Sequence, residues 1–348
     1  MKKRLLSFDI FRILIVFIVF CFHAKLNMNT EFGILADFFA IGNFAMIPFF
    51  VLSGALLYIS SSHKDLHNID GIKRFYIRRL SVIMPGYLLL YIVWSIFLDN
   101  ITTPINKVWS APPQLLGIQS VYHNGQGYYP QNPGTWFISC ILICYLIYPY
   151  LQEITKQMKL KTKVILLLVF YVILAYSPIM CYHFSIESIY SNAFFAILQF
   201  YMGVLITSLS EDVKVPKVLS NWIAFVLEWL VLVAVTTLAV GFVGIRDNST
   251  IYNIVIIPIV CLIVYTALGI KTNTRSKVTV FISDISFEVY LVQCISLPWY
   301  VAQYVSKVLG LTGSMICFAI SIVAGVIGAI ILHYVNKGMG LLLKKACN

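Results

Sequence analysis

The sequence predicts an all-α membrane protein that crosses the bilayer about ten times, with both chain ends in the cytoplasm. Three observations predict this class. Of the 348 residues, 60% are apolar and only 11% are charged, whereas soluble domains have roughly a quarter of their residues charged. Apolar runs long enough to span a bilayer recur along the whole chain. Lysine and arginine gather in alternate loops between these runs.

The predicted spans are ten apolar runs, because about 20 mostly apolar residues cross the hydrocarbon. Each is expected to be a helix, since lipid offers the backbone no hydrogen-bonding partner. We see no soluble domain between them, so residues 1–348 are expected to form a single membrane domain. The runs cover residues 7–25, 39–60, 80–99, 135–151, 163–181, 190–209, 221–243, 251–269, 279–303 and 312–335.

The first run has the basic start of a signal peptide, but its apolar stretch is long, contains Arg12 and lacks a clear cleavage site. We therefore expect it to be a retained span. With the N-terminus inside, the inner segments carry twenty of the 25 lysine and arginine residues and the outer loops carry four. This is the positive-inside pattern, and it accounts for the net charge of +11 without a nucleic acid partner. The 8 cysteines lack metal-ligand spacing with histidine, so no metal site is expected.

One outer segment, residues 100–134, is much longer than the other loops, and long structured loops are uncommon unless functional. Its aromatic side chains stand among glycines, prolines and amides, which suits stacking on sugar rings. An interfacial aromatic belt is the alternative. The aromatic and imidazole residues concerned are Trp109, Tyr122, His123, Tyr128 and Tyr129.

The first span carries three polar residues, Asp9, Arg12 and His23. Arg12 and His23 are 11 residues apart, so they share one helix face and stand about 16 Å apart along the axis. An arginine within a span usually faces protein or a wet cavity, and Asp9 is placed to partner it. A histidine near the outer surface can accept a proton from a hydroxyl or briefly carry an acyl group. The alternative is that Arg12 snorkels inward and His23 lies at the outer interface.

Two further groups of polar residues stand at later spans. Lys73, Arg74, Arg78 and Arg79 enter the third span, where they either hold phosphates or supply ordinary positive-inside charge. The ninth span contains Asp284 and Glu288, and acids within a membrane are functional candidates. It also places Tyr290 and Gln293 on one face. The structural alternative is that Glu288 pairs with Arg12, Arg78 or Arg79.

With these residues assembled, the sequence resembles the bacterial membrane acyltransferase-3 family, whose members O-acylate polysaccharides and related cell-surface molecules. The resemblance rests on five pieces that occur in the family's order. They are Arg12 with His23 after ten intervening residues, PFFVLSG at 48–54, FYIRRLSVIMP at 75–85, GTWFISCILICYLIYP at 134–149 and SFEVYLVQ at 286–293.

The resemblance implies roles for these positions. His23 is the expected catalytic residue, assisted by Arg12 and Asp9. Acetyl-coenzyme A, or a related acyl thioester, is the implied cytoplasmic donor. Its expected binding residues are Arg74, Arg78, Arg79 and Ser53. The expected acceptor-binding residues are Trp136, Glu288, Tyr290 and Gln293.

The sequence departs from the family pattern at three places. Val82 stands where many members have a further arginine, so phosphate binding by that loop differs in detail. Gln293 stands where many have histidine, so Gln293 is not a base. Gly134 and Thr135 replace the histidine and leucine that often precede the tryptophan, which bears on the identity of the acceptor.

The expected function is acyl transfer from cytoplasmic acyl-coenzyme A to a hydroxyl of a cell-surface polysaccharide or lipid-linked sugar, in the inner membrane of a bacterium. Membrane lipid and a second copy of the chain are the other expected partners. A transporter or flippase for polysaccharide or acylated sugar is the main alternative, although no paired broken helices mark one. A structural subunit of a polymer-synthesis complex is a third reading.

Overall fold

The structure is a computed structural model that describes residues 4–28, 32–98, 111–119, 135–186, 191–243, 250–271, 276–296 and 299–347. Within these ranges the regular structure is entirely helical, without a strand. The predicted all-α class is therefore confirmed.

The main helices follow the predicted apolar runs. They are α1 (Leu6–Met28), α2 (Ala36–Ala40), α3 (Met46–Ser61), α4 (Ile69–Val93), α7 (Trp136–Gln157), α8 (Leu160–Ala175), α9 (Ser177–His183), α10 (Ala193–Asp212), α11 (Trp222–Val243), α12 (Thr250–Gly269), α13 (Lys277–Ser296) and α14 (Trp299–Cys347). Short 3-10 turns, η1 (Gly33–Leu35) and η2 (Ile41–Ala45), flank α2, and a π-helical turn, η3 (Trp94–Leu98), ends α4.

Among the described residues, seven helices are long and apolar enough to cross a membrane, or eight if α8 and α9 form one span. The bend between α8 and α9 is 54°. Two predicted spans are not among them: α3, which has 16 residues, and α13, which carries Asp284 and Glu288 within it. The polytopic membrane fold is thus confirmed, while by length and composition fewer helices qualify as spans than the ten apolar runs.

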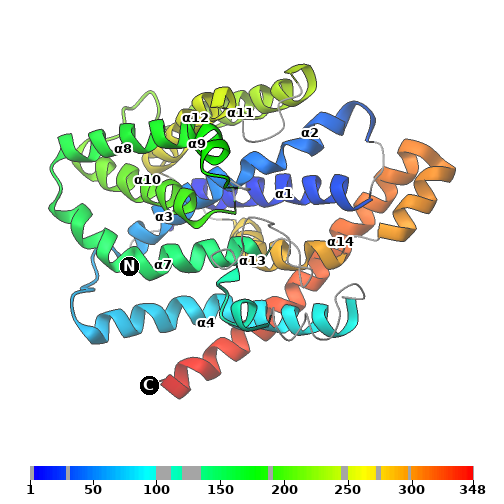
Figure 1. The fold of residues 1–348 in the computed structure, drawn as a ribbon, viewed down its shortest axis with the longest axis horizontal. Helices are drawn as coiled ribbons and strands as arrows, with labels where there is room; N and C mark the ends of the chain where they lie inside the picture. The colour runs from blue at the N-terminus through cyan, green and yellow to red at the C-terminus, as the bar shows by residue number, and fades with distance from the viewer. Residues whose placement is uncertain are drawn as a thin grey trace.

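The long helices lie roughly side by side along the longest axis of the molecule, and α14 crosses them obliquely (Figure 1). The start of α1 and the end of α14 lie at the same end of the bundle, which we call the inner end (Figure 1). This arrangement agrees with a chain whose two ends are on the same side of a membrane.

Helices α3 and α10 pack closely against each other, and most of their residues are buried. A Cβ atom on Gly54 would lie 1.9 Å from the carbonyl oxygen of Phe200, and one on Gly203 would lie 1.9 Å from that of Val51. The two backbones therefore touch at positions where only glycine fits, which is a common way for membrane helices to pack.

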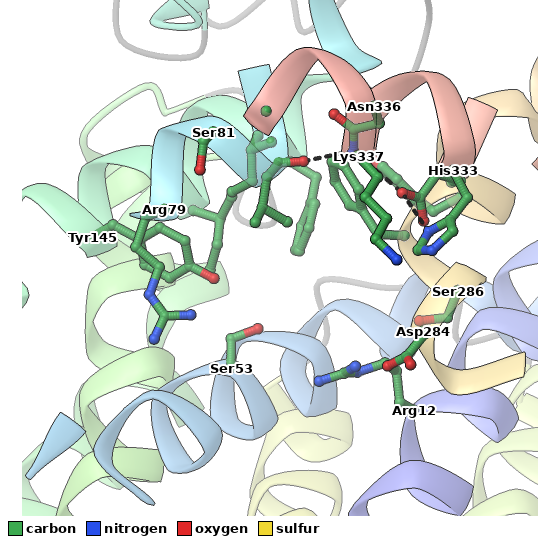
Figure 2. Close-up of a pocket in the computed structure, with 18 of the residues that line it drawn as sticks. Arg12, Ser53, Arg79, Ser81, Tyr145, Asp284, Ser286, His333, Asn336 and Lys337 are labelled. Atoms are coloured by element: carbon green, nitrogen blue, oxygen red, sulfur yellow. Dashed lines mark hydrogen bonds and ion pairs between the residues drawn. The ribbon is translucent and has the colours of Figure 1, made fainter. Parts of the chain in front are cut away.

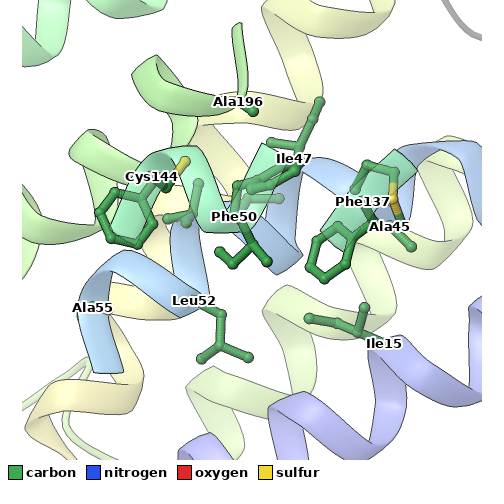
Figure 3. Packing of buried hydrophobic residues seen from close by; sticks show 14 of the residues in the cluster. Ile15, Ala45, Ile47, Phe50, Leu52, Ala55, Phe137, Cys144 and Ala196 are labelled. Atoms are coloured by element: carbon green, nitrogen blue, oxygen red, sulfur yellow. The ribbon is translucent and has the colours of Figure 1, made fainter. Parts of the chain in front are cut away.

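The hydrophobic core surrounds this pair. Figure 3 shows Phe50 of α3 and Phe137 of α7 packed between α1, α3, α7 and α10, and both rings are almost fully buried. Their centroids are 5.1 Å apart. By contrast, large apolar side chains are exposed on the outer helices, including Leu230 of α11 and Ile331 of α14. Such a surface suits lipid, because hydrocarbon chains solvate apolar side chains without cost.

The ninth predicted span differs from the structure at its outer end. The prediction extended it over 279–303, but α13 ends at Ser296 and a new helix begins at Trp299. Residues 297 and 298 lie outside the described residues. The following helix, α14, changes direction at Gly310, whose φ of 56° is favourable only for glycine.

We predict that Gly203→Ala lowers the free energy of unfolding by about 2 kcal/mol, because the new methyl group forces α10 away from α3. The measurement is thermal unfolding of the purified protein in one detergent. Gly338→Ala is the matched control, since a Cβ there meets nothing within 4 Å. Equal unfolding temperatures for the two variants would contradict the tight crossing.

Candidate active site

A central cavity of about 530 Å³ lies between α1, α3, α4, α7, α13 and α14 (Figure 2). Its wall combines apolar rings with an unusual number of charged side chains for the interior of a membrane protein. The lining residues are Arg12, Phe49, Ser53, Arg79, Ser81, Val82, Ile83, Phe137, Ile141, Tyr145, Asp284, Ser286, Phe287, Glu288, Tyr290, His333, Asn336, Lys337, Gly340, Leu341 and Lys344.

A network of ionic hydrogen bonds joins the beginning of α1 to α13. Arg4 donates to Asp9 through Nη2 at 2.6 Å and to Asp284 through Nη1 at 2.7 Å. The hydroxyl of Ser283 donates to Asp9 at 2.8 Å. Asp9 is buried, and these partners compensate the cost of burying its charge.

Asp9 therefore makes its hydrogen bonds with Arg4 and Ser283 and, among the described residues, none with Arg12, although its charge still acts on Arg12. Arg4 lies just before α1, and its guanidinium reaches the Asp9 carboxylate through both Nε and Nη2, a geometry stronger than a single contact. The residue spacing within α1 did not predict Arg4 as the partner of Asp9. Asp9 consequently acts at the junction of α1 and α13 and does not line the central cavity.

Arg12 is directed into the central cavity, with Ser53 and Asp284 near it (Figure 2). Its hydrogen bonds to protein are long: Nη1 donates to the backbone oxygen of Ser283 at 3.4 Å and to its hydroxyl at 3.5 Å. Most of its hydrogen-bonding capacity is thus left for a ligand.

Three more cations line the same cavity, Arg79 from α4 and Lys337 and Lys344 from α14. Arg79 donates to the hydroxyl of Ser60 at 3.0 Å, and its guanidinium lies 5.7 Å from the ring centroid of Tyr145. Together with Arg12, these cations outnumber the two carboxylates of the wall. The cavity is therefore suited to an anionic ligand.

A second hollow, which we call the basic pocket, has a volume of about 420 Å³ and lies at the inner end of α4. Its lining includes Lys64, Arg74, Arg78 and Arg79, so Arg79 lines both the basic pocket and the central cavity. Burial, with the nearby charges of Arg78 and Arg79, lowers the pKa of Lys64. This crowding of positive charge favours binding of phosphate.

Glu288 is buried in the cavity wall and is held by two residues of α14. Its Oε1 lies 3.2 Å from Nδ1 of His333 and accepts a hydrogen bond from Asn336 at 3.2 Å. Its Oε2 is buried without a hydrogen-bond partner among the described residues. The suggested pairing of Glu288 with an arginine is thus wrong. Sequence reasoning missed His333, although an ionisable residue within a predicted span was itself a signal.

His23 is not among the residues that line the central cavity. It lies towards the outer end of α1, and its imidazole is hydrogen-bonded to the side chain of Gln293 on α13. Its Nδ1 is buried and makes no well-formed hydrogen bond to the described residues. The structure thus brings together two predicted residues, His23 and Gln293, that are 270 positions apart.

An aromatic cluster of Phe49, Phe137 and Tyr290 forms the outer wall of the cavity. The Phe137 ring centroid lies 5.2 Å from that of Phe49 and 5.3 Å from that of Tyr290. Tyr290 is one helical turn before Gln293. Tyr290 thus lines the cavity, whereas Gln293, one turn later, and His23 do not.

The remaining predicted residues are placed as follows. Ser53, Glu288 and Tyr290 line the central cavity. Arg74 and Arg78 line only the basic pocket. Trp136 begins α7 and packs its edge against Phe137, with 6.3 Å between ring centroids. The loop residues expected to stack on sugars, Trp109, Tyr122, His123, Tyr128 and Tyr129, lie outside the described residues.

Comparison with known proteins gives one match. The acyltransferase-3 family model, described as an acyltransferase domain, matches residues 5–334. No curated protein and no solved structure matches the chain.

We predict that His333→Leu destabilises the protein by about 2 kcal/mol, because it leaves the buried Glu288 carboxylate with fewer partners. Adding Glu288→Leu removes the unpaired buried charge. The free energy of unfolding of the double variant therefore falls by less than the sum of the two single decreases. Thermal unfolding of the parent, both single variants and the double variant measures this coupling. Strictly additive losses would show that the two side chains do not interact.

Proposed function

The chain belongs to the acyltransferase-3 family, and we propose that it transfers an acetyl or similar acyl group from cytoplasmic acyl-coenzyme A to a hydroxyl of a cell-surface polysaccharide or its precursor. Membership of the family rests on a match over 330 residues, 5–334. The nature of the donor and of the acceptor is the proposal.

The order of groups along the molecule supports this donor most directly. The basic pocket stands at the inner end, Arg79 connects it to the central cavity, and Arg12 stands deeper in that cavity. Coenzyme A has its phosphates at one end and its thioester at the end of a long, largely uncharged arm. A donor that enters the cavity thioester first would keep its phosphates among the inner cations. Its thioester would then lie towards the outer end.

The pair formed by His23 and Gln293 suits the chemical step. The acceptor hydroxyl, arriving from the outer side, gives its proton to the His23 imidazole as its oxygen attacks the thioester carbonyl. The new carbon–oxygen bond replaces the carbon–sulfur bond, and the departing thiolate takes the proton back from His23. Gln293 fixes the orientation of the imidazole through its hydrogen bond. The thioester reaches His23 by passing the aromatic cluster.

We further propose that the protein acts in the inner membrane of a bacterium, with the acceptor bound on the outer side near Trp136. Acetyl-coenzyme A is made and kept in the cytoplasm, whereas surface polysaccharides are completed outside. An acyl group must therefore cross the bilayer, and the central cavity with Arg12 would carry it part of the way towards His23.

We predict that His23→Ala reduces acyl transfer at least 100-fold, because general acid–base catalysis contributes about 10²–10⁴ to rates. The readout is the mass spectrum of surface glycans from cells that carry the parent or the variant, where one acyl mass per modified residue should disappear. His183→Ala is the matched control, since His183 is exposed at the end of α9. Membrane level and unfolding temperature should match the parent.

The same cells separate the competing functions. Polymer that still reaches the surface but lacks acyl groups supports acyl transfer. Loss of the polymer from the surface would instead indicate transport. Full acylation in a correctly inserted His23→Ala variant would refute the role of His23.

A further inference from the structure

The last turns of α14 form one wall of the central cavity and lie beyond residue 334, where the family match ends. Lys337 and Lys344 both line the cavity from this segment. They are seven residues apart, which is close to two helical turns, so they share one face. Neither residue belongs to a motif that the family resemblance covers.

The position of this segment is fixed by α4 at Pro85. Proline has no N–H, so the carbonyl of Ser81 lacks its helical donor. Gly340 packs against that carbonyl: a Cβ at Gly340 would lie 2.3 Å from the Ser81 oxygen. The absence of a side chain at Gly340 therefore lets α14 meet α4 at the point where α4 is weakened.

One helical turn before Gly340, the side chain of Asn336 forms hydrogen bonds between α14 and α4. Its Nδ2 donates to the carbonyl of Val82 at 2.7 Å, and its Oδ1 accepts from the N–H of Gly86 at 3.1 Å. In a regular helix these two backbone groups would bond to each other. The Asn336 amide thus bridges α4 beside Pro85, and Lys337, the next residue, is directed into the cavity (Figure 2).

The charges of the two lysines are not balanced by protein groups. In the described part of the chain, neither ammonium group makes an ion pair, while Asp284 binds Arg4 and Glu288 contacts His333. Arg79 and Arg12 face the same cavity from α4 and α1 (Figure 2). Lys337 is exposed and Lys344 is half-buried, so an anionic ligand in the cavity can reach both ammonium groups.

We propose that Lys337 and Lys344, with Arg79, bind the diphosphate of the coenzyme A donor, while the basic pocket around Arg74 and Arg78 binds its 3′-phosphate. This inference rests on the proposed donor. Coenzyme A carries these two anionic groups in sequence, followed by the arm that bears the thioester. The protein presents two cationic sites in the same sequence, joined by Arg79 and followed by Arg12. The wall of the cavity formed by α14 is then a determinant of donor binding.

The test compares binding of acetyl-coenzyme A with binding of its 3′-dephospho analogue. Calorimetry on the purified full-length protein in nanodiscs gives both affinities without requiring an acceptor. The variants are K337Q/K344Q, R74Q/R78Q and the control Lys345→Gln, an exposed neighbour that does not line the cavity. Unfolding temperatures establish that each variant is folded.

The expected result is a different signature for each variant. K337Q/K344Q lowers the affinity for both ligands by a similar factor, about tenfold or more, because both ligands keep the diphosphate. R74Q/R78Q lowers the affinity for acetyl-coenzyme A and leaves the affinity for the dephospho analogue nearly unchanged. Lys345→Gln changes neither affinity.

Three outcomes would overturn the inference. If K337Q/K344Q lowers the affinity for acetyl-coenzyme A only, the lysines bind the 3′-phosphate and not the diphosphate. If it binds both ligands like the parent, the lysines do not contact the donor. If it binds both like the parent but loses co-purified phosphatidylglycerol, the lysines hold a lipid headgroup. Absence of binding by the parent itself would refute the proposed donor, which is a separate failure.

Discussion

The junction of α1 with α13 is the contact on which the rest of the site depends. Charged groups in a lipid environment must find partners within the protein, and here Arg4, Asp9, Ser283 and Asp284 satisfy one another across that junction. Asp9 makes its hydrogen bonds within this network, and Arg12 lines the cavity. The same helix pair then meets again at its outer end, where His23 contacts Gln293.

The two ends of this junction carry different side chains, and each set suits a different task. The inner end opens into a cavity rich in cations, which suits a charged donor. The outer end has one imidazole and one amide behind an aromatic cluster. In this arrangement Phe49, Phe137 and Tyr290 line the cavity, whereas His23 does not.

Much of the fold could be predicted because it follows from composition and local periodicity. The apolar runs mark the helices, and the shared face of Arg12 and His23 follows from the helical repeat alone. The partners of these residues could not be predicted in the same way. The i,i+3 rule suggested Asp9 for Arg12, but Asp9 bonds to Arg4, which lies before the helix begins, and to Ser283, a tertiary contact that no local rule contains.

The cavity wall formed by α14 was missed for a related physical reason. Lys337 and Lys344 match the positive-inside pattern, so composition explains them without a site. Their direction depends on how α14 crosses α4 at Pro85, and a crossing is set by packing between distant segments. His333 and Asn336 are placed by the same crossing.

We propose that the cavity holding Arg12 opens to the cytoplasm and receives the acyl donor. Ser53 lines this cavity, so Ser53→Cys places a thiol inside it. We expect a membrane-impermeant maleimide to label this thiol, above the background of the parent protein, in inside-out but not in right-side-out vesicles, and acetyl-coenzyme A to slow the labelling. Labelling only from the outer side, or labelling that acetyl-coenzyme A leaves unchanged, would contradict it.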